Sequence, residues 1–175
     1  LNYDNDYYLS ISKPEKANVI AIGNSDKNNF LRRIFTADEF NFQSTELATL
    51  DYNQIENQDA IVLNELEDLP VALGTTLKSF YEKGGNIVLI PNAKNSSSLL
   101  NAFAKNFGGF SYSQLSTSGK QITKINFNHP LYQTVFEKKV TNFQYPNVKE
   151  SFILSGITNI LQYEDNSVFV GSTTN

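Results

Sequence analysis

The hydrophobic pattern is clearest in residues 59–92, where two short apolar runs flank a stripe with helical spacing. Residues 60–63 and 87–90 are unbroken and β-branched, which favours strands that are buried on both faces of a parallel sheet. Between them, four apolar residues recur on one helix face: Leu73, Leu77, Phe80 and Tyr81. The pattern predicts a strand, helix and strand unit with a right-handed crossover.

Both ends of this helix carry sequence signals. Asp68 is expected to cap the helix, and Pro70 lies in the first turn, where a missing N–H costs nothing. Gly84 and Gly85 follow the last apolar position and predict a left-handed stop. We expect Phe80 to lie in the core between this helix and the sheet.

The residues before this unit predict two more strands and a helix. Residues 18–22 form a first buried strand, and residues 40–50 form a weaker one. A turn carries Ile55 inward between the weaker strand and the central unit. The helix after the first strand is expected to use four apolar residues as its buried face: Phe30, Leu31, Ile34 and Phe35.

After the central unit, the serines at 96–98 are expected to cap another helix, which Gly108 and Gly109 end. Its apolar side comprises Leu99, Leu100, Phe103 and Phe107. Beyond it the pattern changes to short strands and turns. The expected strands are residues 121–127, residues 149–154, and a hairpin that pairs residues 160–163 with residues 168–171.

The alternation of buried strands and striped helices predicts an α/β fold. We expect a three-layer sandwich around a mainly parallel sheet with strand order 2-1-3-4, and extra strands in the C-terminal third. Residues 15–175 are expected to form one such domain. Residues 1–14 are expected to be a linker or the last strand of a preceding β-rich domain, in a piece of a longer chain that begins without Met.

The amino-acid composition argues against several classes of function. The 175 residues are 40% hydrophobic, enough to bury a core, and the net charge of -4 with scattered basic residues argues against a nucleic-acid partner. No run of about 18 apolar residues is present, so a membrane contact would need segments outside this sequence. The absence of cysteine excludes disulfides, thiolate metal sites and a cysteine nucleophile.

Motifs for cofactors and catalysis are absent. Neither a dinucleotide-binding glycine pattern nor a hydrolase nucleophile elbow occurs, and we expect no cofactor. Residues 118–121 contain a Gly-Lys pair, but the earlier glycine of a phosphate loop is missing and Gln121 replaces its Ser or Thr. The sequence therefore predicts no nucleotide site.

Proteins with open α/β sheets bind ligands in the loops at the carboxyl ends of their parallel strands. We therefore expect a candidate site at that edge. The residues expected there are Asn24, Ser25, Asn64, Glu65 and Asn92, with Glu67, Lys94 and Asn95 nearby. Glu65, Glu67 and Asp68 can supply oxygen ligands to a hard cation. A solvated, helix-capping acidic turn is the favoured interpretation of these carboxylates, so no metal site is predicted.

The single histidine, His129, lies between Asn128 and Pro130. A lone histidine without a cysteine, a second histidine or a clear nucleophile favours a structural role. It can still act as an acid or base, so it belongs to the candidate ligand site.

Two segments carry a resemblance to a known fold family. The helix ending at residues 80–85 and the strand of residues 86–91 look like the class I glutamine amidotransferase-like superfold. Residues 128–131, Asn-His-Pro-Leu, followed by Val-Phe at 135–136, are similar to the His-Pro segment of its ThuA-like relatives. The resemblance implies a flavodoxin-like parallel sheet and covers about two thirds of the chain.

The resemblance also argues against the activity that the family name describes. Working members place a nucleophilic Cys after the strand that here ends at Ile90, where this chain has Pro91 or Asn92. They also follow His-Pro with Glu, where this chain has Leu131. Since neither Asn nor Pro replaces an activated thiolate, we expect no enzyme activity.

A second resemblance concerns residues 13–24, 30–42 and 61–70, which look like the extracytoplasmic portion of Bat-type aerotolerance membrane proteins of the Bacteroidota. That resemblance implies a preceding membrane region and β-rich segment, and a domain on the periplasmic side. Other envelope proteins would then be its partners. The family assigns no reaction to this domain.

Two functions remain open from the sequence. The first is a non-catalytic, amidotransferase-like module that serves protein contacts or positioning in the bacterial envelope. The alternative is a ThuA-like domain that binds or hydrolyses a small ligand or carbohydrate, using His129 with Glu65 or Asn92. Placement of His129 over the strand edge would favour the second function.

Overall fold

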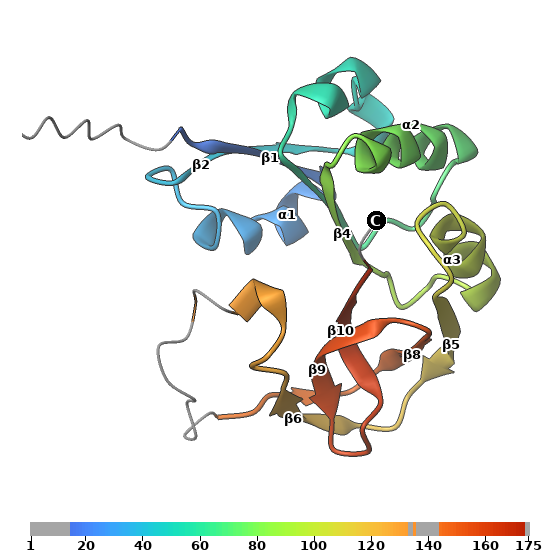
Figure 1. Ribbon diagram of the computed structural model, residues 1–175. Coiled ribbons are helices and arrows are strands. Elements are labelled where there is room, and N and C mark those ends of the chain that lie inside the picture. The colour runs from blue at the N-terminus through green and yellow to red at the C-terminus, as the bar shows by residue number, and fades with distance from the viewer. Residues whose placement is uncertain (1–14, 133–134, 136–143, 174–175) are drawn as a thin grey trace, which may run out of the picture.

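The computed structural model describes residues 15–132, 135 and 144–173 (Figure 1). The expected linker or strand at 1–14 lies outside these residues. A four-stranded parallel sheet has the order β2-β1-β3-β4, formed by β1 (Ala17–Gly23), β2 (Phe40–Thr45), β3 (Ala60–Asn64) and β4 (Asn86–Ile90). The predicted strand order and the parallel pairing are confirmed.

The strands of this sheet differ in how deeply they are buried. β1 and β3 are inner strands, and their apolar residues are almost fully buried because both neighbours and both faces are covered. β4 is an edge strand, and Val88 keeps 47% of its surface exposed. The prediction that residues 87–90 are buried on both faces is therefore wrong, since an apolar run does not reveal that a strand lies at an edge.

One face of the sheet carries the larger core. Ile20, Ile61 and Leu63 pack there with α2 (Val71–Glu82) and α3 (Ser97–Ala104). The helix residues that complete this core are Leu73, Leu77, Phe80, Leu100 and Phe103. The predicted apolar stripes are therefore confirmed for these five residues, and Phe80 is only 6% exposed. Tyr81, Leu99 and Phe107 are only half-buried, and Phe107 packs on the core from beyond the end of α3.

The opposite face has a thinner cover. Val19, Ala21 and Val62 pack there against Leu31, the first residue of the 3-10 helix η1 (Leu31–Arg33). The short α1 (Ser25–Asn28) lies on the same side (Figure 1). A full third layer of helices is not confirmed in the described residues.

The apolar face predicted for the first helix is wrong in part. Phe30 and Ile34 are exposed, whereas Leu31 is buried. The helical phase of α1 ends at Asn28 and gives way to η1, so the four apolar residues no longer share one side.

The ends of α2 and α3 agree with the predictions in part. The N-cap of α2 is Pro70, and the Asp68 carboxylate accepts a hydrogen bond from the Leu69 N–H instead of capping the helix. Gly84 has a φ of 93°, which confirms the left-handed stop. Ser96 caps α3 through a hydrogen bond from Leu99 N–H, as expected, but α3 ends at Ala104, well before Gly108.

Short 3-10 helices connect the remaining segments. The strand predicted at 40–50 stops at Thr45 and continues as η2 (Leu47–Thr49). η3 (Tyr52–Asn57) carries Ile55 inward with no exposed surface, which confirms that expectation. No helix in the described ranges is long and apolar enough to cross a membrane.

The C-terminal third forms a six-stranded antiparallel sheet of order β5-β8-β10-β9-β6-β7 (Figure 1). Its strands are β5 (Ser111–Ser116), β6 (Lys120–Ile125), β7 (Asn147–Val148), β8 (Ser151–Ser155), β9 (Thr158–Tyr163) and β10 (Val168–Ser172). The predicted β9–β10 hairpin is confirmed. The hydrophobic pattern contains no signal for β5, whose six residues are mostly polar and bury only Tyr112.

Two kinds of contact join the antiparallel sheet to the larger core. Tyr112 of β5 and Phe152 of β8 pack edge to face, with ring centroids 6.2 Å apart, and both belong to the core over α2 and α3. The Asn101 amide of α3 bonds both backbone groups of Tyr112, at 2.7 and 2.9 Å. The C-terminal strands therefore share one core with the parallel sheet.

We expect Phe80→Ala to lower the free energy of unfolding by about 3–5 kcal/mol, because it leaves a cavity between α2 and the sheet. Val71→Ala is the matched control on the same helix, since Val71 is 87% exposed and its loss should change stability by less than about 0.5 kcal/mol. Urea titration of the two variants measures the difference, and equal midpoints would contradict the assigned core.

The β9–β10 turn predicts a dependence on pH. The Asp165 carboxylate accepts hydrogen bonds from Lys120 Nζ at 2.7 Å and from Ser167 N–H at 3.0 Å. The Lys120 bond and then the Ser167 bonds hold the pKa of Asp165 well below its usual range. Because the unfolded chain takes up the proton first, this stabilisation is complete above about pH 4 and decreases as the pH falls.

Asp165→Asn should therefore lower stability by about 1 kcal/mol at pH 7, a small value because the carboxylate is half exposed. The difference from the native chain should be smaller at pH 3. Glu164→Gln, in the same turn, serves as the control. Urea titrations at both pH values test this, and a difference that grows towards pH 3 would show that the sign is wrong.

Candidate functional site

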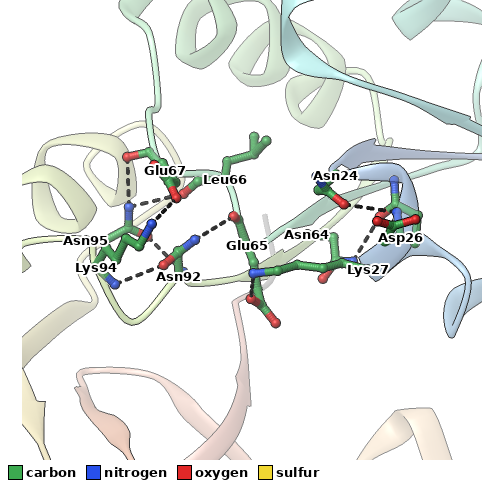
Figure 2. Close-up of polar contacts among 11 residues, drawn as sticks. Asn24, Asp26, Lys27, Asn64, Glu65, Leu66, Glu67, Asn92, Lys94 and Asn95 are labelled. Atoms are coloured by element: carbon green, nitrogen blue, oxygen red, sulfur yellow. Dashed lines mark hydrogen bonds and ion pairs between the residues drawn. The ribbon is translucent and has the colours of Figure 1, made fainter.

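The loops after β1, β3 and β4 meet at the carboxyl edge of the parallel sheet, as the sequence predicts (Figure 2). Asn24 and Ser25 follow β1, Asn64 and Glu65 end and follow β3, and Asn92 follows β4. Asn24 caps α1 by accepting a hydrogen bond from Asp26 N–H at 2.9 Å, and Ser25 is exposed in the first turn. Five of the six predicted site residues therefore lie on adjacent loops.

A buried amide pair links the first two loops. Asn28, which has no exposed surface, accepts a hydrogen bond from Asn64 Nδ2 at 2.9 Å. Its own Nδ2 donates to Ser44 Oγ at 2.8 Å and to Gly23 O at 3.3 Å. Gly23 leaves room for this pair, because an added Cβ would lie 2.4 Å from Asn64 O. Asn28 thus ties β1, β2 and β3 together.

Two further buried amides join the third loop to the second. Asn92 Nδ2 donates to Glu65 O at 2.9 Å, and its Oδ1 accepts from Lys94 N–H at 2.9 Å. Asn95 Nδ2 donates to Leu66 O and to Glu67 O, both at 3.1 Å. Figure 2 shows these residues gathered against the 65–67 segment. We call Asn28, Asn64, Asn92 and Asn95 the asparagine network.

Two ion pairs lie over the network at the surface. Lys27 of α1 contacts Glu65, and Lys94 contacts Glu67 at 2.5 Å. The hydrogen bond from Lys94 holds the pKa of Glu67 below its usual range. Glu65 has a φ of 51°, a conformation uncommon outside glycine, and its backbone N–H donates to Ile90 O at 2.9 Å. Both pairs are exposed, so water and salt screen them and they contribute little to stability.

The three acidic side chains considered for a cation have separate partners. Glu65 faces Lys27, Glu67 faces Lys94, and Asp68 accepts from Leu69 N–H. Within the described part of the chain, no group of three acidic or histidine side chains has the geometry of a metal site. The carboxylates therefore act as partners of lysines and backbone groups.

His129 does not join these residues. It is 7% exposed and lies just before η4 (Pro130–Tyr132), and its Nε2 is 2.8 Å from Ser172 Oγ of β10. The Leu131 N–H donates to Nδ1 at 3.3 Å. The Leu131 contact fits the tautomer with its lone pair on Nδ1, in which Nε2 donates to Ser172 Oγ.

Two cavities in the described residues lie away from the carboxyl edge. One, of about 260 Å³, is at the opposite end of the sheet and is lined in part by Gln58, Lys83 and Asn86. The other, of about 190 Å³, lies beside β2. Neither is lined by an asparagine of the network.

Sequence reasoning misses the central residue of the network. Asn28 lies between the first predicted strand and the apolar face predicted for the following helix, and nothing in its neighbours marks it as buried. The sequence also does not predict that Lys27 pairs with Glu65. The two residues are 38 positions apart, and their contact joins α1 to the loop after β3. The sequence predicts that Asn95 lies near the edge. Its hydrogen bonds to the backbone of Leu66 and Glu67 are seen only in the structure.

No protein-family model matches the chain, and no curated protein is similar enough to match it. One solved structure with a similar fold is described as a GMP synthase subunit from Thermoplasma acidophilum. It shares 7% identity, with 88% of this chain and 70% of that chain covered, at a TM-score of 0.43. These values are too low to assign a family or an activity.

Asn28→Ala should lower the free energy of unfolding by about 1–3 kcal/mol, because it removes three hydrogen bonds and leaves the Asn64 amide and Gly23 O without their partner. Asn57→Ala is the control, since Asn57 is exposed at the end of η3. Chemical denaturation of both variants provides the comparison. A cost for Asn28→Ala no larger than that of the control would mean that the network is not structural.

Proposed function

We propose that this chain is a non-catalytic α/β module that serves protein contacts or positions neighbouring parts of a bacterial envelope protein. One observation carries the proposal: the carboxyl edge, where α/β enzymes bind substrates, is filled by the asparagine network. Among the described residues, the buried side-chain atoms without a hydrogen-bond partner belong to Gln58 and Ser151, outside the network. No fully buried side-chain atom of the network therefore lacks a hydrogen-bond partner.

The residue after β4 supports the same proposal. In working amidotransferases this position holds the nucleophile, and here it is Pro91 or Asn92. Asn92 is buried, and its amide is committed on both sides, to Glu65 O and to Lys94 N–H. An amide nitrogen held in this way is not a nucleophile.

The tautomer of His129 is a second support. A base that activates Ser172 would need its lone pair on Nε2, whereas the Leu131 N–H places the lone pair on Nδ1. His129 also lies beside η4 and β10, and no described contact joins it to Glu65 or Asn92. The geometry that a ThuA-like hydrolytic site would require is therefore not favoured.

The proposal also includes a fold relationship to amidotransferases and a periplasmic location. We infer an amidotransferase-like, flavodoxin-like relationship from residues 80–91 and 128–131, together with the parallel order β2-β1-β3-β4. The similarity of residues 13–24, 30–42 and 61–70 to Bat-type membrane proteins supports a periplasmic position. Membrane attachment would come from other parts of the longer protein, and the partners would be envelope proteins.

The purified chain should release ammonia from glutamine only at the background rate, because without a nucleophile no thioester forms. Native protein and His129→Ala are compared under identical conditions, with a working amidotransferase as the positive control. Circular dichroism checks that both chains are folded.

Equal background rates in the two proteins are the expected result. Losing a nucleophile removes several orders of magnitude in rate, so genuine turnover would be easy to distinguish. Ammonia release by the native chain that disappears in His129→Ala would overturn the non-catalytic assignment.

A further inference from the structure

The chain contains only two arginines, and they are adjacent and exposed. Arg32 and Arg33 form most of η1, on the side of β2. The Arg32 guanidinium lies 5.6 Å from the ring centroid of Phe42, and that of Arg33 lies 5.9 Å from the ring of Phe30. These contacts hold both side chains against aromatic surfaces.

Neither arginine has a carboxylate partner in the described residues. The five ion pairs found there all use lysine. Asp38 and Glu39 follow η1 on the next turn, but neither forms an ion pair with Arg32 or Arg33 within 4 Å. A guanidinium donates two parallel hydrogen bonds to a carboxylate, and no carboxylate among the described residues uses those of Arg32 or Arg33.

Apolar side chains surround these arginines. Phe30 and Ile34, which flank the arginines in the sequence, are 68% and 65% exposed. The cavity of about 190 Å³ opens beside them and is lined by Arg32, Phe35, Ala37, Phe40 and Phe42. Phe35 stacks on Phe42 and packs edge to face with Phe40, so the three aromatic rings that line the cavity contact one another. Aromatic residues and arginine are the types enriched in protein interfaces.

The backbone beside this cavity is also open. β2 is the last strand of the parallel sheet and pairs only with β1 in the described residues (Figure 1). Ala17 N–H donates to Glu39 O, so alternate residues from 39 onward face β1, and Phe42 and Ser44 direct their backbone groups outward. β2 has no Pro, no Lys and no bulge to block pairing.

We propose that Phe30, Arg32, Arg33, Ile34 and the outer edge of β2 form a docking surface for an extended, acidic segment of a partner protein. The segment pairs with the backbone of β2 and directs its carboxylates to the two guanidinium groups. Its apolar side chains lie against Phe30, Ile34 and the cavity. This inference rests on the proposed role in protein contacts and adds the surface and the chemistry of the partner.

Charge distinguishes this occupant from two others. A second copy paired edge to edge through β2 would bring the same arginines towards each other, which costs free energy through like-charge repulsion. A nucleic acid needs a broad basic surface, whereas the chain has a net charge of -4. A short acidic segment matches two cations at the edge of an acidic protein.

A displayed library of random ten-residue peptides, selected against the 175-residue chain, tests the surface directly. We expect the enriched peptides to alternate Asp or Glu with apolar residues and to carry no Pro at their centre. Binding of the enriched peptides should weaken at least tenfold in Arg32→Gln and also weaken in Arg32→Lys, which keeps the charge but loses the planar fork. Lys105→Gln, which removes one exposed charge from the end of α3, is the matched control and should bind as the native chain does.

Several outcomes would overturn the inference. They are a selection that enriches no acidic sequence, enriched peptides that bind Arg32→Gln as well as native protein, and sedimentation that shows dimers disrupted by Arg32→Gln. Peptides that bind strongly at another surface would remove the β2 site while leaving the proposed interaction role intact. The glutamine assay tests the non-catalytic part of the proposed function separately.

Discussion

The hydrogen bond from Asn64 Nδ2 to Asn28 Oδ1 lies at the point where the first three strands of the parallel sheet end. Loops that leave parallel strands at one edge bring several backbone carbonyls together, and each needs a donor if it is shielded from water. Here the chain supplies donors from amide side chains, which can donate and accept at once. The same four asparagines hold the loops at this edge together.

Much of the fold follows from the periodicity of the sequence. The strand order, the two striped helices and the β9–β10 hairpin are predictable, because buried strands and helix faces leave repeating apolar patterns. The predictions that are wrong concern position within the tertiary structure. Val88 is exposed because β4 is an edge strand, and Phe30 and Ile34 are exposed because α1 stops early. Neither edge location nor helix length is encoded by hydrophobicity alone.

The sequence predicts which residues gather at the candidate site, but not what their side chains bind. Residues after each strand must gather at one edge, so Asn24, Glu65 and Asn92 are correctly grouped on adjacent loops. Whether an asparagine there binds a ligand or a neighbouring loop depends on hydrogen-bond distances of about 3 Å between segments far apart in the chain. Asn28 escapes prediction for this reason, and the described side-chain hydrogen bonds of His129 go to Ser172 and Leu131 rather than to the other predicted site residues.

The contrast between the two edges of the parallel sheet is the physical basis of the proposals. At the carboxyl edge, buried amides bond one another and the nearby backbone, so a ligand that bound to these amides would first have to break internal hydrogen bonds. Along the side of β2, no other described strand pairs with the outer backbone groups, and Phe30, Ile34 and the two arginines are exposed among the described residues. A partner at β2 gains hydrogen bonds and apolar contact without disrupting the fold. Binding free energy is therefore more accessible at the lateral edge, which favours protein contact over chemistry at the strand ends.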